Sequence, residues 1–132
     1  MNRGMPFDFS AVDDLRFQGL NNYHDGLAAE DAVALRYSDE GYDLQARRWR
    51  GEAGEIDLIF EGDDGFVFVE VKKSSSHARA VEALSWHQMQ RICLAAEEYA
   101  GAERPGQLVN MRLDLATVDG LGQIEVLQNI SL

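Results

Sequence analysis

Hydrophobic residues recur with a helical period in two segments of the chain. From Leu20 onward, apolar side chains fall on one stripe of a helix, and Gly41 is the expected end of that helix. The stripe consists of Leu20, Tyr23, Leu27, Ala34 and Leu35. A second helix is expected after Ser85, because a serine followed three residues later by Gln88 has the form of a capping box. The apolar face of this second helix holds Met89, Ile92, Cys93, Ala96 and Ala100. We expect it to end at Gly101.

The remaining apolar residues lie in short segments that are typical of β-strands. The first of these segments alternates apolar and polar positions, with Tyr42, Leu44 and Ala46 on one face. The next two are rich in branched and aromatic residues, and the glycines and aspartates of 62–65 predict a tight turn between them. A second tight turn is expected at 119–122. The five predicted strands are 42–49, 55–60, 66–72, 110–118 and 123–129.

The order of these elements predicts an α/β fold with a mixed central sheet. A helix, a three-strand meander, a second helix and two strands follow one another, so the helices are expected to cover the sheet. Hydrophobic residues make up 45% of the 132 positions, which is enough for one domain with its own core. We assign residues 19–132 to this domain. Residues 1–18 show no period and are expected to form an irregular N-terminal arm.

Charge limits how the protein could bind nucleic acid. The chain has 23 acidic and 12 basic residues and a formal net charge of −11, which disfavours binding by overall attraction to phosphates. Half of the lysines and arginines lie between Arg47 and Arg79, so any nucleic-acid surface is expected to be local. The alternative is that this basic segment is a solvated strand face. The candidate phosphate contacts are Arg48, Arg50, Lys73 and Arg79.

The sequence shows no sign of export or of membrane insertion. The N-terminal residues contain no apolar segment of the signal-peptide type, and no run of roughly 18 apolar residues occurs. The single cysteine, Cys93, has no second thiol with which to form a disulfide. We therefore expect a cytoplasmic protein that does not associate with membranes.

The chemical signal in this chain comes from acidic residues on the predicted hairpin. A turn centred on 63–64 pairs residues whose numbers sum to 127, which places Asp57 opposite Glu70 and Glu55 opposite Lys72. An odd-length loop would instead put Asp57 and Glu70 on opposite faces. Two adjacent carboxylates repel each other unless a cation or a proton relieves them, and hard divalent ions prefer such oxygen ligands. The spacing therefore predicts a Mg²⁺-type site.

Two further residues extend this predicted site. Glu30 lies within the apolar stripe of the first helix, although acids also occur at the edges of such stripes. Lys72 follows Glu70 at a spacing that keeps both side chains on one face of the strand. Its ammonium could orient an attacking water and stabilise negative charge in the transition state of phosphodiester hydrolysis. The alternative for Lys72 is an ordinary surface ion pair.

The spacing of these residues resembles a known nuclease signature. Twelve residues separate Asp57 from the Glu70-Val71-Lys72 run, as in the Asp, Glu-x-Lys pattern of PD-(D/E)xK nucleases. The order of several blocks also resembles the YraN-type family of bacterial proteins, which look related to archaeal Holliday junction resolvases. The blocks begin at Gly26, Gly41, Gly54, Val69 and Arg112. The resemblance covers roughly residues 20–130.

The resemblance implies a restriction-endonuclease-like core with a site for Mg²⁺ or Mn²⁺. The residues expected around the ion are Glu30, Asp57, Glu70, Lys72 and Gln88. The ligands would be Asp57, Glu70 and the backbone carbonyl of Val71. Glu55 would be either a partner of Lys72 or an additional ligand. Gln88 has the alternative explanation of the capping box.

The resemblance further implies metal-dependent hydrolysis of phosphodiester bonds in structured or branched DNA. The alternative is a non-catalytic module that keeps the nuclease fold and binds nucleic acid or a protein; a third reading is an α/β interaction protein with solvated acids. Ser74 and His87 stand where the YraN-type pattern tends to have basic residues, which lowers the expected affinity for DNA. By analogy, symmetric junction substrates would suit a two-fold dimer.

Overall fold

The fold is built on one mixed five-stranded sheet, and the computed structural model describes residues 27–74, 79 and 84–130. Neighbouring strands follow the order β1-β2-β3-β4-β5. The strands are β1 (Asp43–Arg50), β2 (Glu55–Gly62), β3 (Gly65–Lys73), β4 (Met111–Val118) and β5 (Ile124–Leu127). Strands β3 and β4 run parallel, whereas the other neighbours are antiparallel. The predicted α/β class and the mixed sheet are therefore confirmed.

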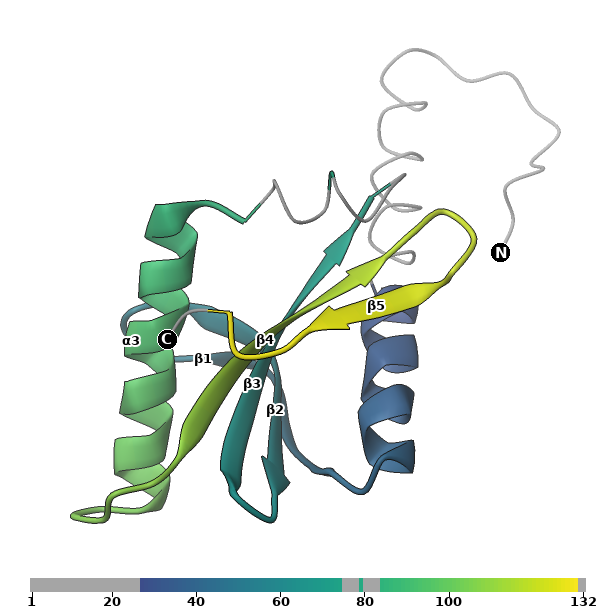
Figure 1. The fold of residues 1–132 in the computed structure, drawn as a ribbon. Helices are drawn as coiled ribbons and strands as arrows, with labels where there is room; N and C mark the ends of the chain where they lie inside the picture. The colour runs from purple at the N-terminus through teal and green to yellow at the C-terminus, as the bar shows by residue number, and fades with distance from the viewer. Residues whose placement is uncertain (1–26, 75–78, 80–83, 131–132) are drawn as a thin grey trace, which may run out of the picture.

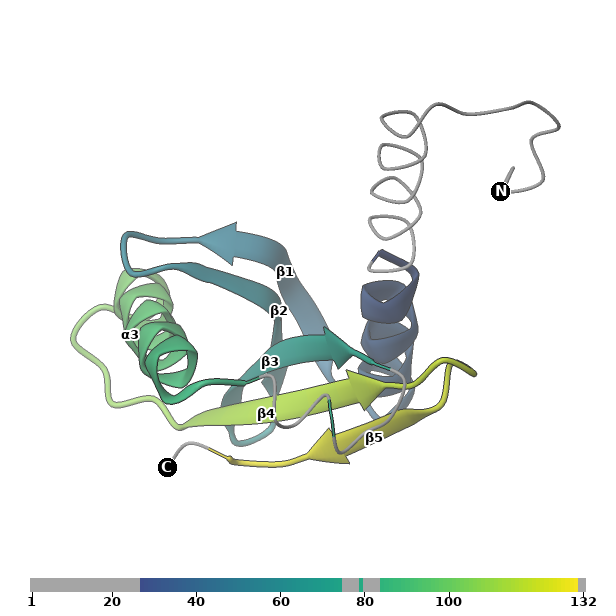
Figure 2. The same ribbon diagram turned by 90° about the horizontal axis from the view of Figure 1, so that it is seen from above.

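Two helices cover opposite faces of this sheet (Figures 1 and 2). Residues 27–39 are helical, and α3 (Trp86–Glu103) lies between β3 and β4 in the chain. The predicted order of helix, three strands, helix and two strands is thus confirmed. Neither helix, over the part of the chain that is described, is long and apolar enough to cross a membrane. The predicted arm of residues 1–18 lies outside the described residues, as do Leu20 and Tyr23.

The first helix packs on one sheet face through a stripe of small and aromatic side chains. The stripe contains Ala29, Val33, Ala34 and Tyr37, and the facing strand residues include Leu58, Phe60, Val67 and Val69. Leu35 was predicted in this stripe but is 63% exposed, because it lies about 100° around the helix from Ala34. The helix ends at residue 39, and Gly41 adopts a φ of +97°, which confirms the predicted stop.

Helix α3 packs on the other face against the aromatic residues of β3. Its buried residues are Ile92, Ala95, Ala96, Tyr99 and Ala100, and they contact Ile59, Phe66, Phe68 and Leu113. The predicted start is confirmed, because the Oγ of Ser85 accepts the backbone N–H of Gln88 at 3.1 Å. The predicted end at Gly101 is wrong, since α3 continues to Glu103. A glycine costs a helix only about 1 kcal/mol, and one more backbone bond joins the Arg104 N–H to the Ala100 carbonyl.

Strand β1 departs from the regular alternation that its sequence suggested. The register with β2 shifts between Leu44 and Ala46, and Arg48 takes a left-handed φ of +49°. As a result Tyr42 packs with the first helix, whereas Ala46 packs on the α3 side. The prediction that Tyr42, Leu44 and Ala46 share one face is therefore wrong, because an extra residue in a strand reverses the faces beyond it.

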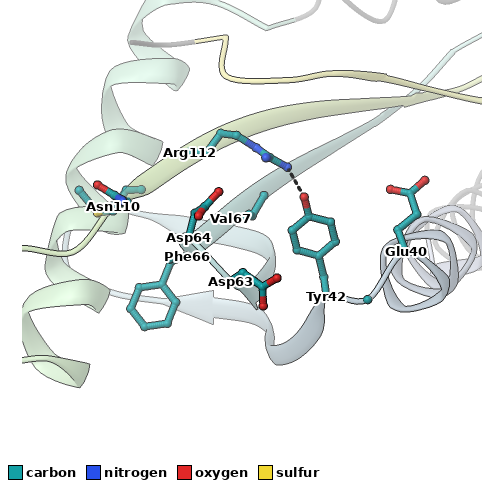
Figure 3. A pocket seen from close by; sticks show the side chains of 12 residues that line it. Glu40, Tyr42, Asp63, Asp64, Phe66, Val67, Asn110 and Arg112 are labelled. Carbon is teal, nitrogen blue, oxygen red and sulfur yellow. Dashed lines mark hydrogen bonds between the residues drawn. The ribbon is translucent and has the colours of Figure 1, made fainter.

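A buried carboxylate on β4 ties several parts of the fold together. Asp114 is fully buried and accepts the Tyr37 hydroxyl at 2.6 Å and the Asn129 N–H at 3.0 Å. The Arg112 guanidinium donates two further bonds to Asp114, both at 2.9 Å, and one bond at 3.2 Å to the Tyr42 hydroxyl (Figure 3). Asp114 thus fixes the first helix and the segment after β5 to the sheet, and its partner Arg112 adds Tyr42, which directly precedes β1.

We expect Asp114→Asn to lower the free energy of unfolding by about 2–4 kcal/mol, because Arg112 would keep a partly buried charge without its counter-ion. Urea denaturation would measure the change. Glu40→Gln is the matched control, since it removes one acid from the exposed Arg36–Glu40 pair and should cost less than about 0.5 kcal/mol. Equal losses in the two variants would contradict a central role for Asp114.

Candidate functional site

The β2–β3 hairpin brings Asp57 and Glu70 together at the end remote from its turn. The last paired residues are Leu58 and Val69, whose numbers sum to the predicted 127. The predicted register is therefore confirmed along the paired part of the hairpin. Glu70 is 6% exposed and Asp57 is partly buried, so both carboxyl groups are shielded from solvent to a large extent.

Strands β2 and β3 separate beyond that last pair, at Asp57. The backbone N–H of Val71 has no ladder partner on β2 and instead donates to Asp57 Oδ2 at 2.8 Å. Ile56 packs with the α3 side of the core, whereas Leu58 packs on the side of the first helix, although regular alternation would place the two residues on one face. The change of face marks the point where β2 turns away from β3 and opens a gap next to the acid pair.

The carboxyl groups of Asp57 and Glu70 are hydrogen-bonded to each other. Burial, and then repulsion by Asp57, raises the pKa of Glu70 to about 8. Burial also raises the pKa of Asp57, against the lowering effect of the Val71 N–H. In the absence of a cation the pair therefore retains a proton near neutral pH.

Two donors approach Glu70 from different elements. Lys72 Nζ lies 3.2 Å from Glu70 Oε2, and Gln88 Nε2 donates to the same oxygen at 3.0 Å. The capping box is thus only half formed, because the Gln88 backbone bonds to Ser85 while its side chain bonds to Glu70. Lys72 and Gln88 therefore both lie next to Glu70, while their roles at a metal site stay predictions.

Glu30, on the first helix, lies near Asp57 of the acid pair. It is 8% exposed, as its place in the apolar stripe predicted. Burial raises the pKa of Glu30, the hydrogen bond from Arg48 lowers it, and the negative charge of Asp57 raises it further. Arg48 donates to both oxygens of Glu30, at 3.0 and 3.2 Å. Arg48, predicted to contact phosphate, is therefore held in a part-buried ion pair with Glu30.

The predicted register placed Glu55 opposite Lys72, but Glu55 does not lie there. Its Oε1 lies 3.3 Å from Arg50 on β1, in an exposed ion pair. The predicted pairing fails because β2 leaves β3 at Asp57, two residues later in the chain, so the hairpin register does not reach Glu55.

A cavity of about 460 Å³ opens beside the acid pair. Its lining residues are Arg50, Gly54, Glu55, Asp57, Glu70, Gln88, Arg91 and Ile92. The loop between β1 and β2 forms one wall, and Glu98 of α3 holds this loop by accepting the N–H groups of Glu52, at 2.9 Å, and Ala53, at 3.4 Å. Arg91 and Glu98 were not predicted as site residues. The sequence does indicate Arg91, because it lies one helical turn after Gln88, but no pattern in the sequence indicates Glu98.

The donor atoms at this cavity suit a small hard cation. Two carboxylates are available, and the carbonyl of Val71 points to the same side of its strand as the N–H that reaches Asp57. Over residues 27–74, 79 and 84–130, no three acid, histidine or cysteine side chains gather as a complete metal-binding group. The set is nevertheless compatible with Mg²⁺, which commonly takes one or two protein carboxylates and completes its shell with water and substrate oxygens.

The other predicted phosphate contacts are scattered. Arg50 is exposed and lines the cavity beside the acid pair. Lys73 is exposed at the end of β3, and Arg79 is exposed in the segment that follows. The structure therefore brings one of the four predicted basic residues, Arg50, to the cavity.

A second hollow, of about 500 Å³, lies at the opposite end of the hairpin (Figure 3). Asp63 and Asp64 of the β2–β3 turn line it together with Tyr42, Asn110 and Arg112. The Arg112 guanidinium already bonds to Asp114 and to Tyr42, and the two turn aspartates are exposed. Despite its size, this hollow therefore lacks the buried, mutually perturbed acids of the smaller cavity.

Comparison with known proteins identifies relatives over most of the chain. The family model described as "Uncharacterised protein family UPF0102" matches residues 29–118, which include every acid of the cavity and Lys72. The chain is 49% identical to a UPF0102 protein of Ruegeria pomeroyi, over 87% of this chain and 94% of the relative. It is 50% identical to one from Cereibacter sphaeroides, over 84% and 95%. The YraN-type resemblance is thereby confirmed at the level of this family.

We expect metal-free protein to lose stability as the pH rises from 4.5, the ordinary pKa of Glu70, to about 8, its pKa in the fold. Over this window the folded carboxyl keeps a proton that the unfolded carboxyl releases, so folding becomes less favourable with rising pH. Glu70→Gln removes this proton equilibrium. Its Tm relative to wild type should therefore increase with pH when both are melted in a chelator. Parallel Tm curves for the two proteins would contradict the assigned environment of Glu70.

Proposed function

We propose that this chain, which belongs to the uncharacterised protein family UPF0102, is a metal-dependent nuclease that hydrolyses phosphodiester bonds in structured or branched DNA. The observation that carries the proposal is the meeting of Asp57, Glu70 and Lys72 beside an open cavity. Two carboxyls in contact, one buried and one partly buried, destabilise each other, which makes a ligand of opposite charge the economical reason for their arrangement. The resemblance to PD-(D/E)xK nucleases, and the restriction-endonuclease-like core that it implies, support the same reading.

The proposed metal ligands are Asp57, Glu70 and the carbonyl of Val71. Mg²⁺ or Mn²⁺ bound there would act as a Lewis acid on a phosphoryl oxygen of the substrate. Gln88 orients the carboxylate of Glu70 by its hydrogen bond. Glu30 lies near enough to interact with the charge of Asp57, and Arg48 holds Glu30 in place.

Lys72 is proposed to act on the attacking water and on the phosphoryl group of the substrate. Its ammonium lies at the edge of the acid pair, 3.2 Å from Glu70, and its side chain is only 23% exposed. A positive charge in this position would orient the attacking water and stabilise the negative charge that builds on the phosphoryl oxygens. The low exposure strengthens this electrostatic effect relative to a lysine in free solution.

A non-catalytic binding module on the same fold is the second candidate. The observation that favours it is the charge of the chain, since a net charge of −11 weakens attraction to DNA. A module of this kind would bind a ligand at the cavity but leave phosphodiester bonds intact. The two candidate functions therefore differ in whether a bound DNA strand is cleaved.

In the presence of Mg²⁺ or Mn²⁺, the protein should cleave at least one of three substrates, namely single-stranded, flapped or four-way DNA. Asp57→Ala and Lys72→Ala should each reduce the rate roughly a hundredfold or more, because each removes a charge that acts in the transition state. Asp64→Ala, in the exposed turn, is the matched control and should cleave like the wild type. Cleavage that survives both site substitutions would sink the proposal, whereas binding without cleavage would favour the module.

Ion binding can be measured without any substrate. Mn²⁺ should raise the Tm of the wild type and of Asp64→Ala, because an ion that binds only the folded state stabilises it. The increase should be lost in Asp57→Ala, which lacks one of the proposed ligands. An equal increase in all three proteins would place the ion elsewhere.

A further inference from the structure

The cavity beside the acid pair contains a guanidinium that has no counter-ion among the described residues. Arg91 lines this cavity from α3 and is exposed. It lies one helical turn after Gln88, so both side chains project from the same face of α3. Within residues 27–74, 79 and 84–130, no carboxylate or carbonyl oxygen is bonded to Arg91. A cationic donor is thus exposed toward solvent next to two carboxylates.

The arginines of β1 differ from Arg91 because each has an acidic partner. Arg47 lies 2.7 Å from Asp31, and Arg48 is held by Glu30. Each of these acids cancels the charge of its arginine, so β1 offers little net positive charge to the many phosphates along the two strands of a double helix.

Two cationic side chains line the cavity itself, one from α3 and one from β1. Arg91 comes from α3, and Arg50 comes from the end of β1, where its pair with Glu55 is exposed to solvent. Exposed pairs of this kind are weak and exchange partners at little cost. Arg50 can therefore turn to an incoming phosphate more readily than the part-buried Arg48.

The local charge balance limits how many phosphates the cavity can hold. Its three carboxylates are Glu55, Asp57 and Glu70, and its three cations are Arg50, Arg91 and the adjacent Lys72. These charges cancel, so a bound divalent ion would leave two positive charges. Two phosphodiester groups, with one negative charge each, would neutralise them.

We propose that Arg91 binds the phosphate next to the one that is hydrolysed, and that the substrate is an unpaired DNA strand held through about two phosphates by Arg50 and Arg91. The proposal rests on the nuclease function for the identity of the polymer, and it narrows that function to unpaired segments such as the flaps of branched DNA. A cavity of about 460 Å³ is of the size that takes a small ligand, which suits entry of a single strand rather than a duplex.

Binding can be measured separately from cleavage by replacing Mg²⁺ with Ca²⁺, another cation that prefers oxygen ligands. The probe is a fluorescent single-stranded oligonucleotide of ~10 nucleotides, compared with its duplex by anisotropy at several salt concentrations. We expect the single strand to bind more tightly, with a slope of log K against log salt of about −1.4, the value for two phosphates.

Arg91→Gln should weaken single-strand binding about tenfold or more and reduce the size of the salt slope by about 0.7. Arg91→Lys should recover most of the slope, because it restores the charge, but less of the affinity, because it lacks the two-pronged contact. Arg36→Gln is the matched control, since it makes the same change in net charge on the first helix, away from the cavity, and should bind like the wild type.

An unchanged salt slope in Arg91→Gln, or a duplex bound as tightly as the single strand, would overturn this inference. Absence of binding by the wild type would overturn it as well. Cleavage that needs Asp57 but is insensitive to Arg91→Gln would leave the nuclease proposal standing without this substrate. Binding that depends on Arg91, without any cleavage, would support the strand-binding role and reject the nuclease.

Discussion

The hydrogen bond from the Val71 N–H to the Asp57 carboxylate is the contact on which the site depends. Strands β2 and β3 part at this point, and an unpaired backbone donor there would cost about 1–3 kcal/mol. Asp57 removes this cost by taking the place of the missing strand. Because the same carboxyl also contacts Glu70, the opening of the sheet and the meeting of the acids have one cause. Neither feature can be changed without the other.

The donor groups around Asp57 and Glu70 hold this acid pair in place without cancelling the repulsion between the two carboxyls. Lys72 and Gln88 both contact one oxygen of Glu70, yet the pKa of Glu70 remains raised to about 8 because burial and Asp57 outweigh them. By contrast, Asp114 accepts four hydrogen bonds from three residues, which join the first helix and the segment after β5 to β4. The two buried acid sites of this sheet thus differ in their contacts, since Asp114 meets an arginine whereas Glu70 meets a second acid. An incompletely balanced site is where binding of a cation releases free energy.

The sequence was sufficient for those parts of the site that depend on local rules. The turn at 63–64 determined the hairpin register and hence the meeting of Asp57 and Glu70, and Ser85 marked the start of α3. Contacts between distant segments were not predictable in this way. Arg48 could pair with any of several acids of the chain, and no periodicity in the sequence indicates that its partner is Glu30. The register shift in β1 likewise has no residue signature, and it reversed the faces expected for Ala46.

These distant pairs also change how the charge of the chain should be read. A count of basic residues along β1 suggests a phosphate-binding surface, but Arg47 and Arg48 are each matched by an acid of the first helix. Their positive charge therefore contributes little at a distance, where the net charge of −11 dominates and repels polyanions. Among the described residues, attraction is favoured within the cavity, where Arg91 acts over a few ångströms and the proposed cation would add to its positive charge. A protein with this distribution of charge would select its ligand by the shape and chemistry of a short segment rather than by the total charge of the polymer.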